Sequence, residues 1–318
     1  MARINEIEGL LGNLLHQVKN LLAALVVDLD GLIIARSSVE GFDEELIGAI
    51  MAILDQTITK IKRYAETAFG TGTFDTNDFQ LFYMELGNKV PAIFVLVANH
   101  YSNIDQFIPY VYIVAEKISS ILSNHNVSLN IPHLTKEGEL ILPAEEYNKK
   151  NVRKIALIGS EAVGKSRLAQ MYCGGNFNEN GLYKPTLGIS ISEKELQISS
   201  SFNLTLYLLD LSGLKSLVKV RKFYYKYSNV ILILFDYSNL ETLNNISGWI
   251  EESRHFIKNQ EIPFILIGNK IDKIEDREVI KHQAQRLADQ YNIPFFETSA
   301  FTGEGIDELF TSLISNLF

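Results

Sequence analysis

Residues 159–166 read GSEAVGKS, and this spacing of glycines, lysine and serine is suited to holding phosphate groups. Gly159 and Gly164 let the backbone curl so that successive N–H groups point at phosphate oxygens, and a following helix adds the positive end of its dipole. Lys165 can reach β and γ phosphates, and the Ser166 hydroxyl can ligate magnesium. A glycine-rich turn that matches by chance is the plainer alternative, but the apolar stretch KIALIG before it supplies the expected strand. The residues expected to line the phosphates are Gly159, Ser160, Glu161, Ala162, Val163, Gly164, Lys165, Ser166 and Arg167.

A second group of residues is suited to reading a nucleotide base. The apolar stretch FILIGNKID ends in Asn-Lys-x-Asp. The Asp272 carboxylate can accept hydrogen bonds from N1–H and the exocyclic amine of guanine, whereas adenine would leave this acceptor unpaired. We expect Asn269 to tie this loop to the phosphate loop and the stem of Lys270 to lie over the base. In FFETSA, backbone N–H groups at Ser299 and Ala300 can meet the guanine O6.

Between these two groups lie residues that can sense a γ-phosphate. In YKPTLG, the Thr186 hydroxyl can ligate magnesium when a γ-phosphate is present, and Tyr183 can close over the phosphates. An ordinary loop threonine and tyrosine are the plainer interpretations of this pair. In DLSGLK, Asp210 would hold magnesium through a water, and the Gly213 N–H can reach the γ-phosphate. The expected magnesium ligands are Ser166, Thr186 and, through a water, Asp210.

These motifs occur in one order, and from them residues 151–318 are identified as resembling a Ras-superfamily small GTPase with Rab-like and Arf-like features. The resemblance implies a P-loop fold with a six-stranded, mostly parallel sheet and helices on both faces. It also implies GTP and GDP as ligands, Mg²⁺ dependence and conformational switching.

Two residues depart from the family pattern that this resemblance brings. Leu214 stands where most members carry a glutamine that orients the attacking water, and leucine cannot hydrogen-bond a water. Glu161 stands where many members keep glycine; its carboxylate either orients that water or is simply solvated. We therefore expect Lys165, Thr186 and Gly213, with Glu161 as the weakest candidate, to carry a hydrolysis that is very slow without assistance.

The first half of the chain has the pattern of a separate α/β domain. Apolar side chains recur at helical spacing over residues 4–22, and two strand-like runs around Asp30-Gly31 predict a hairpin. A long amphipathic helix with Asp43 as its N-cap, three strands and a helix with Pro109 in its first turn follow. This order, with ALVVDLDGLIIARS, resembles the roadblock/dynein light-chain family, whose members are α/β sandwiches that often dimerise and bind small GTPases. A generic profilin-like sensing module is the alternative.

We therefore expect a roadblock-like domain with a five-stranded sheet at residues 1–123, a linker at 124–150 and a Ras-like domain at 151–318. The linker prediction rests on polar composition, two prolines and lost periodicity. Within it, ELILP is apolar enough to dock on one of the domains, and the sequence does not say which.

The charge and the composition of the chain limit the classes of partner that we expect. Residues 1–150 carry 11 basic and 19 acidic side chains, and the whole chain has a net charge of −9, so we expect no nucleic-acid partner. The start MARIN and the end SNLF lack lipidation signals, so we expect no direct membrane anchor, and the single cysteine fits a cytoplasmic protein.

The sequence thus predicts a slow GTP-binding switch, regulated or dimerised by its roadblock-like half through a homodimer or an intramolecular contact. Roadblock proteins or GTPase regulators are possible partners. The alternative is a non-cycling, guanine-nucleotide-bound scaffold that acts through protein contacts.

Overall fold

The computed structural model describes residues 2–65, 70–87, 91–102, 104–135, 139–148, 151–174, 185–200, 202–257 and 261–317. The chain divides into two compact units, Met1–His133 and Leu134–Phe318. Each unit has its own sheet and its own core. The division falls within the segment that the sequence predicts as a linker.

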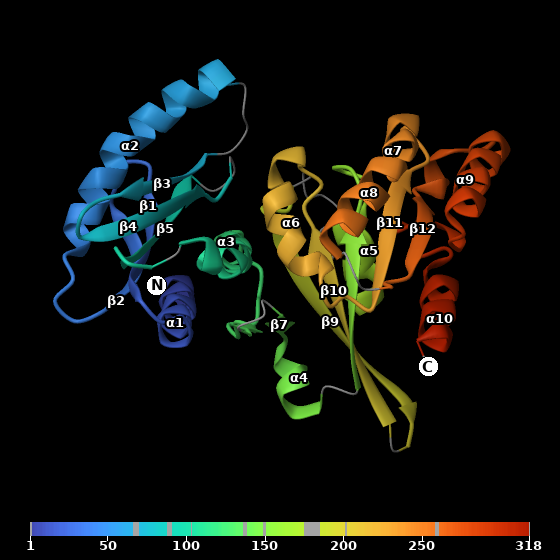
Figure 1. Ribbon diagram of the computed structural model, residues 1–318, viewed down its shortest axis with the longest axis horizontal. Coiled ribbons are helices and arrows are strands. Elements are labelled where there is room, and N and C mark those ends of the chain that lie inside the picture. Colours follow the sequence, from blue (N-terminus) through green and yellow to red (C-terminus); the bar gives the residue numbers. More distant parts are fainter. Residues whose placement is uncertain are drawn as a thin grey trace. The chain divides into compact units, whose positions relative to one another are not determined.

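The first unit follows the order expected from the sequence: helix, two strands, helix, three strands, helix (Figure 1). Its sheet has the order β2-β1-β5-β4-β3, and every neighbouring pair is antiparallel. The elements are α1 (Ala2–Gln17), β1 (Leu21–Asp28), β2 (Ile33–Ser38), α2 (Glu44–Ala65), β3 (Thr71–Asp75), β4 (Phe79–Glu85), β5 (Ala92–Asn99), η1 (Ile104–Phe107) and α3 (Ile108–Leu122).

Three local predictions for this unit are confirmed. Gly31 has φ +83° in the β1–β2 turn, a conformation that glycine adopts without strain. The Asp43 carboxylate accepts a hydrogen bond from the Leu46 N–H at the start of α2. Pro109 lies in the first turn of α3, where its missing N–H costs no helical hydrogen bond.

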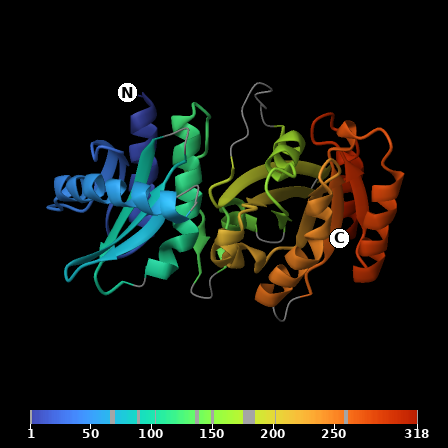
Figure 2. The same ribbon diagram turned by 90° about the horizontal axis from the view of Figure 1, so that it is seen from above.

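Alternation along the strands places apolar side chains on both faces of this sheet. Ile47 and Met51 of α2 pack with alternate residues of β1 and β5, such as Leu25 and Val95, on one face. Helices α1 and α3 contact each other, and α1 also contacts β1 and β2 (Figure 2). The central strands β1 and β5 are therefore buried almost completely.

The second unit is built around a six-stranded sheet with the order β13-β12-β11-β8-β10-β9, in which only β9 runs antiparallel to its neighbour. Its elements are α4 (Pro143–Asn148), β8 (Val152–Ile158), α5 (Lys165–Cys173), β9 (Ile189–Ser199), β10 (Phe202–Leu211), η3 (Lys215–Leu217), α6 (Val218–Tyr225), β11 (Val230–Asp236), α7 (Leu240–Asn244), α8 (Ile246–Ile257), β12 (Phe264–Asn269), η4 (Ile271–Lys273), α9 (Glu278–Tyr291), β13 (Phe295–Thr298) and α10 (Ile306–Asn316). A short ribbon of β6 (His133–Leu134) and β7 (Leu140–Ile141) precedes them.

The parallel strands are short apolar runs because helices cover both of their faces. Every residue of β11 is buried, and α5 and α10 pack on one face of the sheet. On the other face α6 contacts α8, which contacts β11 (Figure 1). The carboxyl ends of β8, β10, β11, β12 and β13 therefore lie along one edge of the sheet, where open α/β folds hold their ligands. Among the described parts of the chain, no helix combines the length and the apolar character needed to cross a membrane.

The start of the predicted linker is bound to the first unit. The Asn13 side chain donates to the Leu129 carbonyl, Gln17 donates to the Pro132 carbonyl, and Lys117 donates to the Ser128 carbonyl. Ile131 is buried. Residues 124–132 are thus held against α1 and α3 of their own unit.

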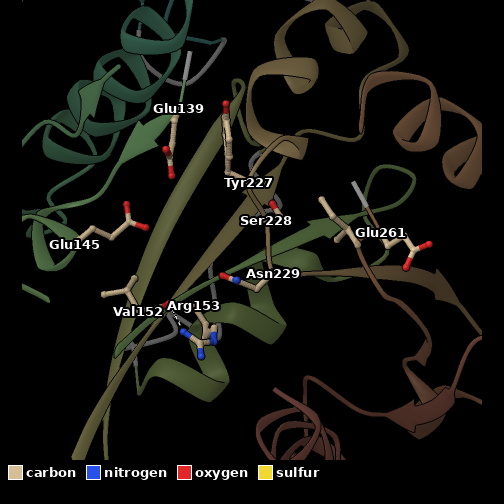
Figure 3. A pocket seen from close by; sticks show the side chains of 9 residues that line it. Glu139, Glu145, Val152, Arg153, Tyr227, Ser228, Asn229 and Glu261 are labelled. Carbon is tan, nitrogen blue, oxygen red and sulfur yellow. Dashed lines mark hydrogen bonds between the residues drawn. The ribbon is translucent and has the colours of Figure 1, made fainter. Parts of the chain in front are cut away.

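The later part, which contains ELILP, docks on the second unit and so answers the question that the sequence left open. Leu140 and Leu142 are buried, and the Tyr207 hydroxyl on β10 accepts a hydrogen bond from the Ala144 N–H. Lys154 on β8 donates to the Leu140 carbonyl and pairs with Glu145 at 3.0 Å. A pocket of about 500 Å³ opens at this amino end of β8, lined by Glu139, Glu145, Val152, Arg153, Tyr227, Ser228, Asn229, Glu261 and Ile262 (Figure 3).

Replacing Lys154 with methionine is expected to destabilise the second unit by about 3–5 kcal/mol, because Glu145 would keep a buried charge without its partner. The two side chains are only 4% and 5% exposed. Trp249, the single tryptophan, lies in this unit, so its fluorescence during urea unfolding measures the effect. Replacing both Lys154 with methionine and Glu145 with leucine should restore most of the loss; a double variant as unstable as the single one would contradict this account.

Candidate functional site

The phosphate-binding sequence forms a tight loop between β8 and α5. Gly159 has φ +135° and Gly164 has φ +101°, both in the region that glycine favours. A Cβ on Gly159 would lie 2.3 Å from the Leu234 carbonyl oxygen, and one on Gly164 would lie 2.2 Å from the Asn269 amide nitrogen. Ala162 also has positive φ, at +59°. The loop therefore turns sharply at three residues with positive φ and leads into the N-terminus of α5, which is the geometry of an anion site.

Lys165 lies within this loop. The residue is 6% exposed, and its ammonium donates to the carbonyls of Gly159 at 2.9 Å and Ser160 at 2.8 Å. Burial lowers the pKa of Lys165 to about 8, and the nearby Asp210 carboxylate opposes this shift. A phosphate group would offer this ammonium charged acceptors in place of two neutral carbonyls.

Oxygen atoms from three distant parts of the sequence meet beside Lys165. The Asp210 carboxylate accepts from the Ser166 hydroxyl at 2.6 Å and from the Thr186 hydroxyl at 3.0 Å, and the two hydroxyls are 3.3 Å apart. Asp210 is 1% exposed, and its Oδ1 has no hydrogen-bond partner within the described structure. Burial raises the pKa of Asp210, against the effects of Lys165 and of both hydroxyls. This all-oxygen set with an unsatisfied carboxylate oxygen fits Mg²⁺, which uses one or two carboxylates together with hydroxyls, waters and phosphates.

The DLSGLK segment passes directly over the phosphate loop. A Cβ on Gly213 would lie 2.6 Å from the backbone nitrogen of Glu161, so only glycine allows this approach. The Ser212 N–H donates to the Gly188 carbonyl at 2.8 Å, which joins this segment to the one that carries Thr186. Leu214 is partly buried and Glu161 is exposed. Tyr183 lies outside the described residues.

The base-reading residues form one connected group at the ends of β12 and β13. The Asn269 amide donates to the Val163 carbonyl at 2.8 Å, so the predicted tie to the phosphate loop is confirmed. The Asn269 side-chain oxygen, Oδ1, accepts from the Ala300 N–H at 2.9 Å. Asp272 is exposed and accepts a hydrogen bond from the buried Ser299 hydroxyl. Its carboxylate is thereby oriented while it remains open to a ligand.

Two basic residues next to these motifs have their own partners. Lys270 has φ +66°, and its ammonium donates to the Asp236 carboxylate at 2.6 Å. Arg167 donates to the Ala300 carbonyl at 3.2 Å, and its guanidinium lies 4.5 Å from the centre of the Phe301 ring. The Arg167 side chain thus links the phosphate-loop helix to the base-reading strand end, although sequence reasoning placed it only at the phosphates.

Sequence reasoning missed several residues that support the site. The Tyr237 hydroxyl donates to Glu297 at 2.7 Å, and Glu297 also pairs with Lys281 at 2.9 Å. These contacts lower the pKa of Glu297 although burial opposes the change. Asp236 ends β11 as Asp210 nears the end of β10, and this position at a strand end was an available signal. The buried Arg221 gave no such signal, because charged residues on a short helix usually face solvent.

Comparison with known proteins places this site in a family. The model of the Ras family matches residues 154–318. The Ras-related protein Rab-26 of Mus musculus is 32% identical over 164 residues, which are 52% of this chain and 62% of the relative. The Ras-related protein Rab-4 of Dictyostelium discoideum is 33% identical over 157 residues, 49% of this chain and 75% of the relative. RabZ of the same organism is 32% identical over 174 residues, 54% of this chain and 74% of the relative. The chain spans about three fifths of the length of the mouse and rat Rab-26 proteins that it matches.

Proposed function

Because this chain belongs to the Ras family, we propose that it is a GTP-binding molecular switch that hydrolyses GTP slowly in the presence of Mg²⁺. The observation that carries the proposal is the meeting of Ser166, Thr186 and Asp210 beside Lys165, with one buried carboxylate oxygen left without a partner. Thr186 comes from the segment that would respond to a γ-phosphate. The site therefore suits a ligand that carries both phosphates and a cation.

The residues of the site would perform hydrolysis mainly by stabilising charge. Lys165 would hold the β and γ phosphates, and the Gly213 N–H would donate to a γ-phosphate oxygen. Bound Mg²⁺ would neutralise part of the negative charge on these phosphates. Leu214 offers no hydrogen bond to orient the attacking water, so the intrinsic rate should lie below the family's value of about 10⁻⁴ per second.

A specific observation favours the alternative of a scaffold that keeps guanine nucleotide bound. The side chain at residue 214 is apolar, and Glu161 is exposed to solvent. If neither residue orients a water, the GTP-bound state would persist and the chain would act through protein contacts. An intact set of γ-phosphate-sensing residues favours the switch.

We propose that the first unit is a roadblock-like domain that dimerises the chain or regulates its nucleotide cycle in cis or in trans. Support comes from its five-stranded sheet, flanked by helices, with β3 as an open edge strand. Edge strands offer unpaired backbone groups to a second copy. GTPase regulators or other roadblock proteins are further proposed partners, and the proposed location is the cytoplasm.

Single-turnover GTP hydrolysis with Mg²⁺ tests these proposals in the full chain and in a fragment of residues 134–318, with folding of the fragment checked by circular dichroism. A faster full chain would mean that the first unit supplies what Leu214 lacks. Bound but unhydrolysed GTP in both proteins would favour the scaffold. Failure of the full chain to bind either guanine nucleotide would contradict both functions.

Replacing Leu214 with glutamine is expected to raise the single-turnover rate of the full chain by about tenfold or more, because an amide can orient the attacking water. The affinity for GDP should not change. An unaltered rate would mean that water orientation does not limit hydrolysis in this chain. Leu214→Met, which stays apolar, is the matched control.

A further inference from the structure

Arg221 of α6 carries a charge that is almost completely removed from water, since the residue is only 1% exposed. Its guanidinium makes two hydrogen bonds to Glu252 of α8, from Nε to Oε1 and from Nη2 to Oε2, both at 2.8 Å. It also stacks 4.7 Å from the centre of the Trp249 ring. The Tyr225 hydroxyl donates to the same carboxylate. Arg221 is therefore held firmly against α8 from two sides.

The remaining guanidinium nitrogen, Nη1, makes hydrogen bonds to the DLSGLK segment that passes over the phosphate loop. Nη1 donates to the Ser212 carbonyl at 2.9 Å and to the Leu214 carbonyl at 2.6 Å. These carbonyls belong to the residues on either side of Gly213. One side chain thus holds the peptide group before Gly213 and the peptide group after Leu214.

Because the peptide bond is planar, these hydrogen bonds also determine the direction of the Gly213 N–H. The Ser212 carbonyl and the Gly213 N–H belong to one peptide plane and point in opposite directions across a trans bond. While Arg221 holds the carbonyl on its own side, the N–H must point away from Arg221. The Ser212 N–H is fixed as well, by the Gly188 carbonyl. The Ser212–Gly213 peptide therefore has little freedom to rotate.

We propose that Arg221 is a positioning residue that aims the Gly213 N–H at the γ-phosphate, with Glu252 and Trp249 as its anchor on α8. This inference rests on the proposed binding of GTP. Arg221 touches no part of the phosphate loop in its recorded contacts and acts through the Ser212–Gly213 peptide. The effect of this positioning falls on the triphosphate state, because GDP offers no γ-phosphate to that N–H.

The affinities of the full chain for GDP and for a non-hydrolysable β,γ-imido analogue of GTP, measured with Mg²⁺ by fluorescent-nucleotide displacement, test this inference. Arg221→Gln should weaken binding of the analogue about ten- to a hundredfold, the range for losing one hydrogen bond to a charged group. Binding of GDP should change less than about twofold. Glu252→Gln keeps the arginine but weakens its anchor, so it should cause a smaller loss of the same kind. Glu251→Gln, which changes the exposed neighbour of Glu252, is the matched control and should alter neither affinity.

Each other outcome overturns the inference. Equal losses for both nucleotides would make Arg221 a purely structural residue, and unchanged affinities in a folded Arg221→Gln chain would remove its role. If Arg221→Gln does not fold, Arg221→Lys and Glu252→Gln decide, because both retain a charge or a hydrogen-bonding group in place. A wild-type chain that binds neither nucleotide would overturn the proposed function and this inference with it. A wild type that binds both, with no selective loss in the variants, would overturn this inference alone.

Discussion

Replacing Lys165 with alanine is expected to abolish tight binding of GTP and GDP. The ammonium is buried inside the phosphate loop and makes hydrogen bonds only to carbonyls in its recorded contacts, so bound phosphates would become its strongest acceptors. Truncating one partner of such a buried charge pair costs about 2–5 kcal/mol, which corresponds to a loss of roughly 30-fold to several thousandfold in affinity. Isothermal titration calorimetry with GDP and Mg²⁺ measures the loss directly.

The stability of the nucleotide-free chain is the control that separates loss of binding from loss of folding at Lys165. Burial lowers the pKa of Lys165 to about 8, so the charged form is held at a cost to the folded state. We therefore expect Lys165→Met, which keeps the aliphatic stem, to leave the unfolding midpoint of the nucleotide-free chain unchanged or higher. The rise in midpoint that GDP causes in the wild type should disappear. Retained affinity in a folded variant would contradict the assignment of the phosphate loop.

Replacing Asp272 with asparagine is expected to switch the preference of the site from guanine to xanthine nucleotides. The carboxylate accepts from two donors on guanine, whereas an asparagine amide would set a donor against one of them and leave it unpaired. Xanthine carries an oxygen where guanine carries its exocyclic amine, so the amide of the variant would find an acceptor there. Sites built on such hydrogen bonds discriminate by factors of about 10⁴–10⁵, so we expect a change of at least about a hundredfold in each direction.

Competition between GTP and xanthosine triphosphate for the wild type and the variant measures this switch. Asp276→Asn changes another exposed carboxylate four residues later and should leave the preference for guanine intact. A variant of Asp272 that loses both nucleotides equally would mean that the residue supports the loop through Ser299 rather than reading the base.

The parts of the fold that depend on local rules could be predicted from the sequence. Asp43 caps a helix, Gly31 turns a hairpin and Asn269 joins two loops because each does so through its own side chain or backbone preference. The phosphate loop could be placed because the spacing of its glycines, lysine and serine after an apolar strand is specific, and the structure shows that only glycine fits where Gly159 meets the Leu234 carbonyl. In each case the residue type alone restricts the structure.

The missed features depend on which charges become buried, and a single sequence does not reveal this. Lys154 and Arg221 resemble surface charges in the sequence, yet both are almost completely buried by elements that are distant along the chain. Their partners Glu145 and Glu252 lie 9 and 31 residues away, so no short motif joins them. The sequence also did not show on which domain ELILP docks, because its apolar side chains suit either one.

The docking of residues 140–148 on β8 also restricts where recombination can join this Ras-family domain to another domain. Recombination that joins a Ras-family domain to a new neighbour conserves function only where the crossover spares buried partners. A crossover at residue 151 would match the start of the Ras-like domain predicted from the sequence but would leave the Lys154 ammonium without Glu145 or the Leu140 carbonyl. A crossover near residue 134 would carry both along. Recombination that exchanges the first unit should therefore fall upstream of the segment that contacts Lys154. That segment and the Ras-family domain should be transmitted together as one heritable module.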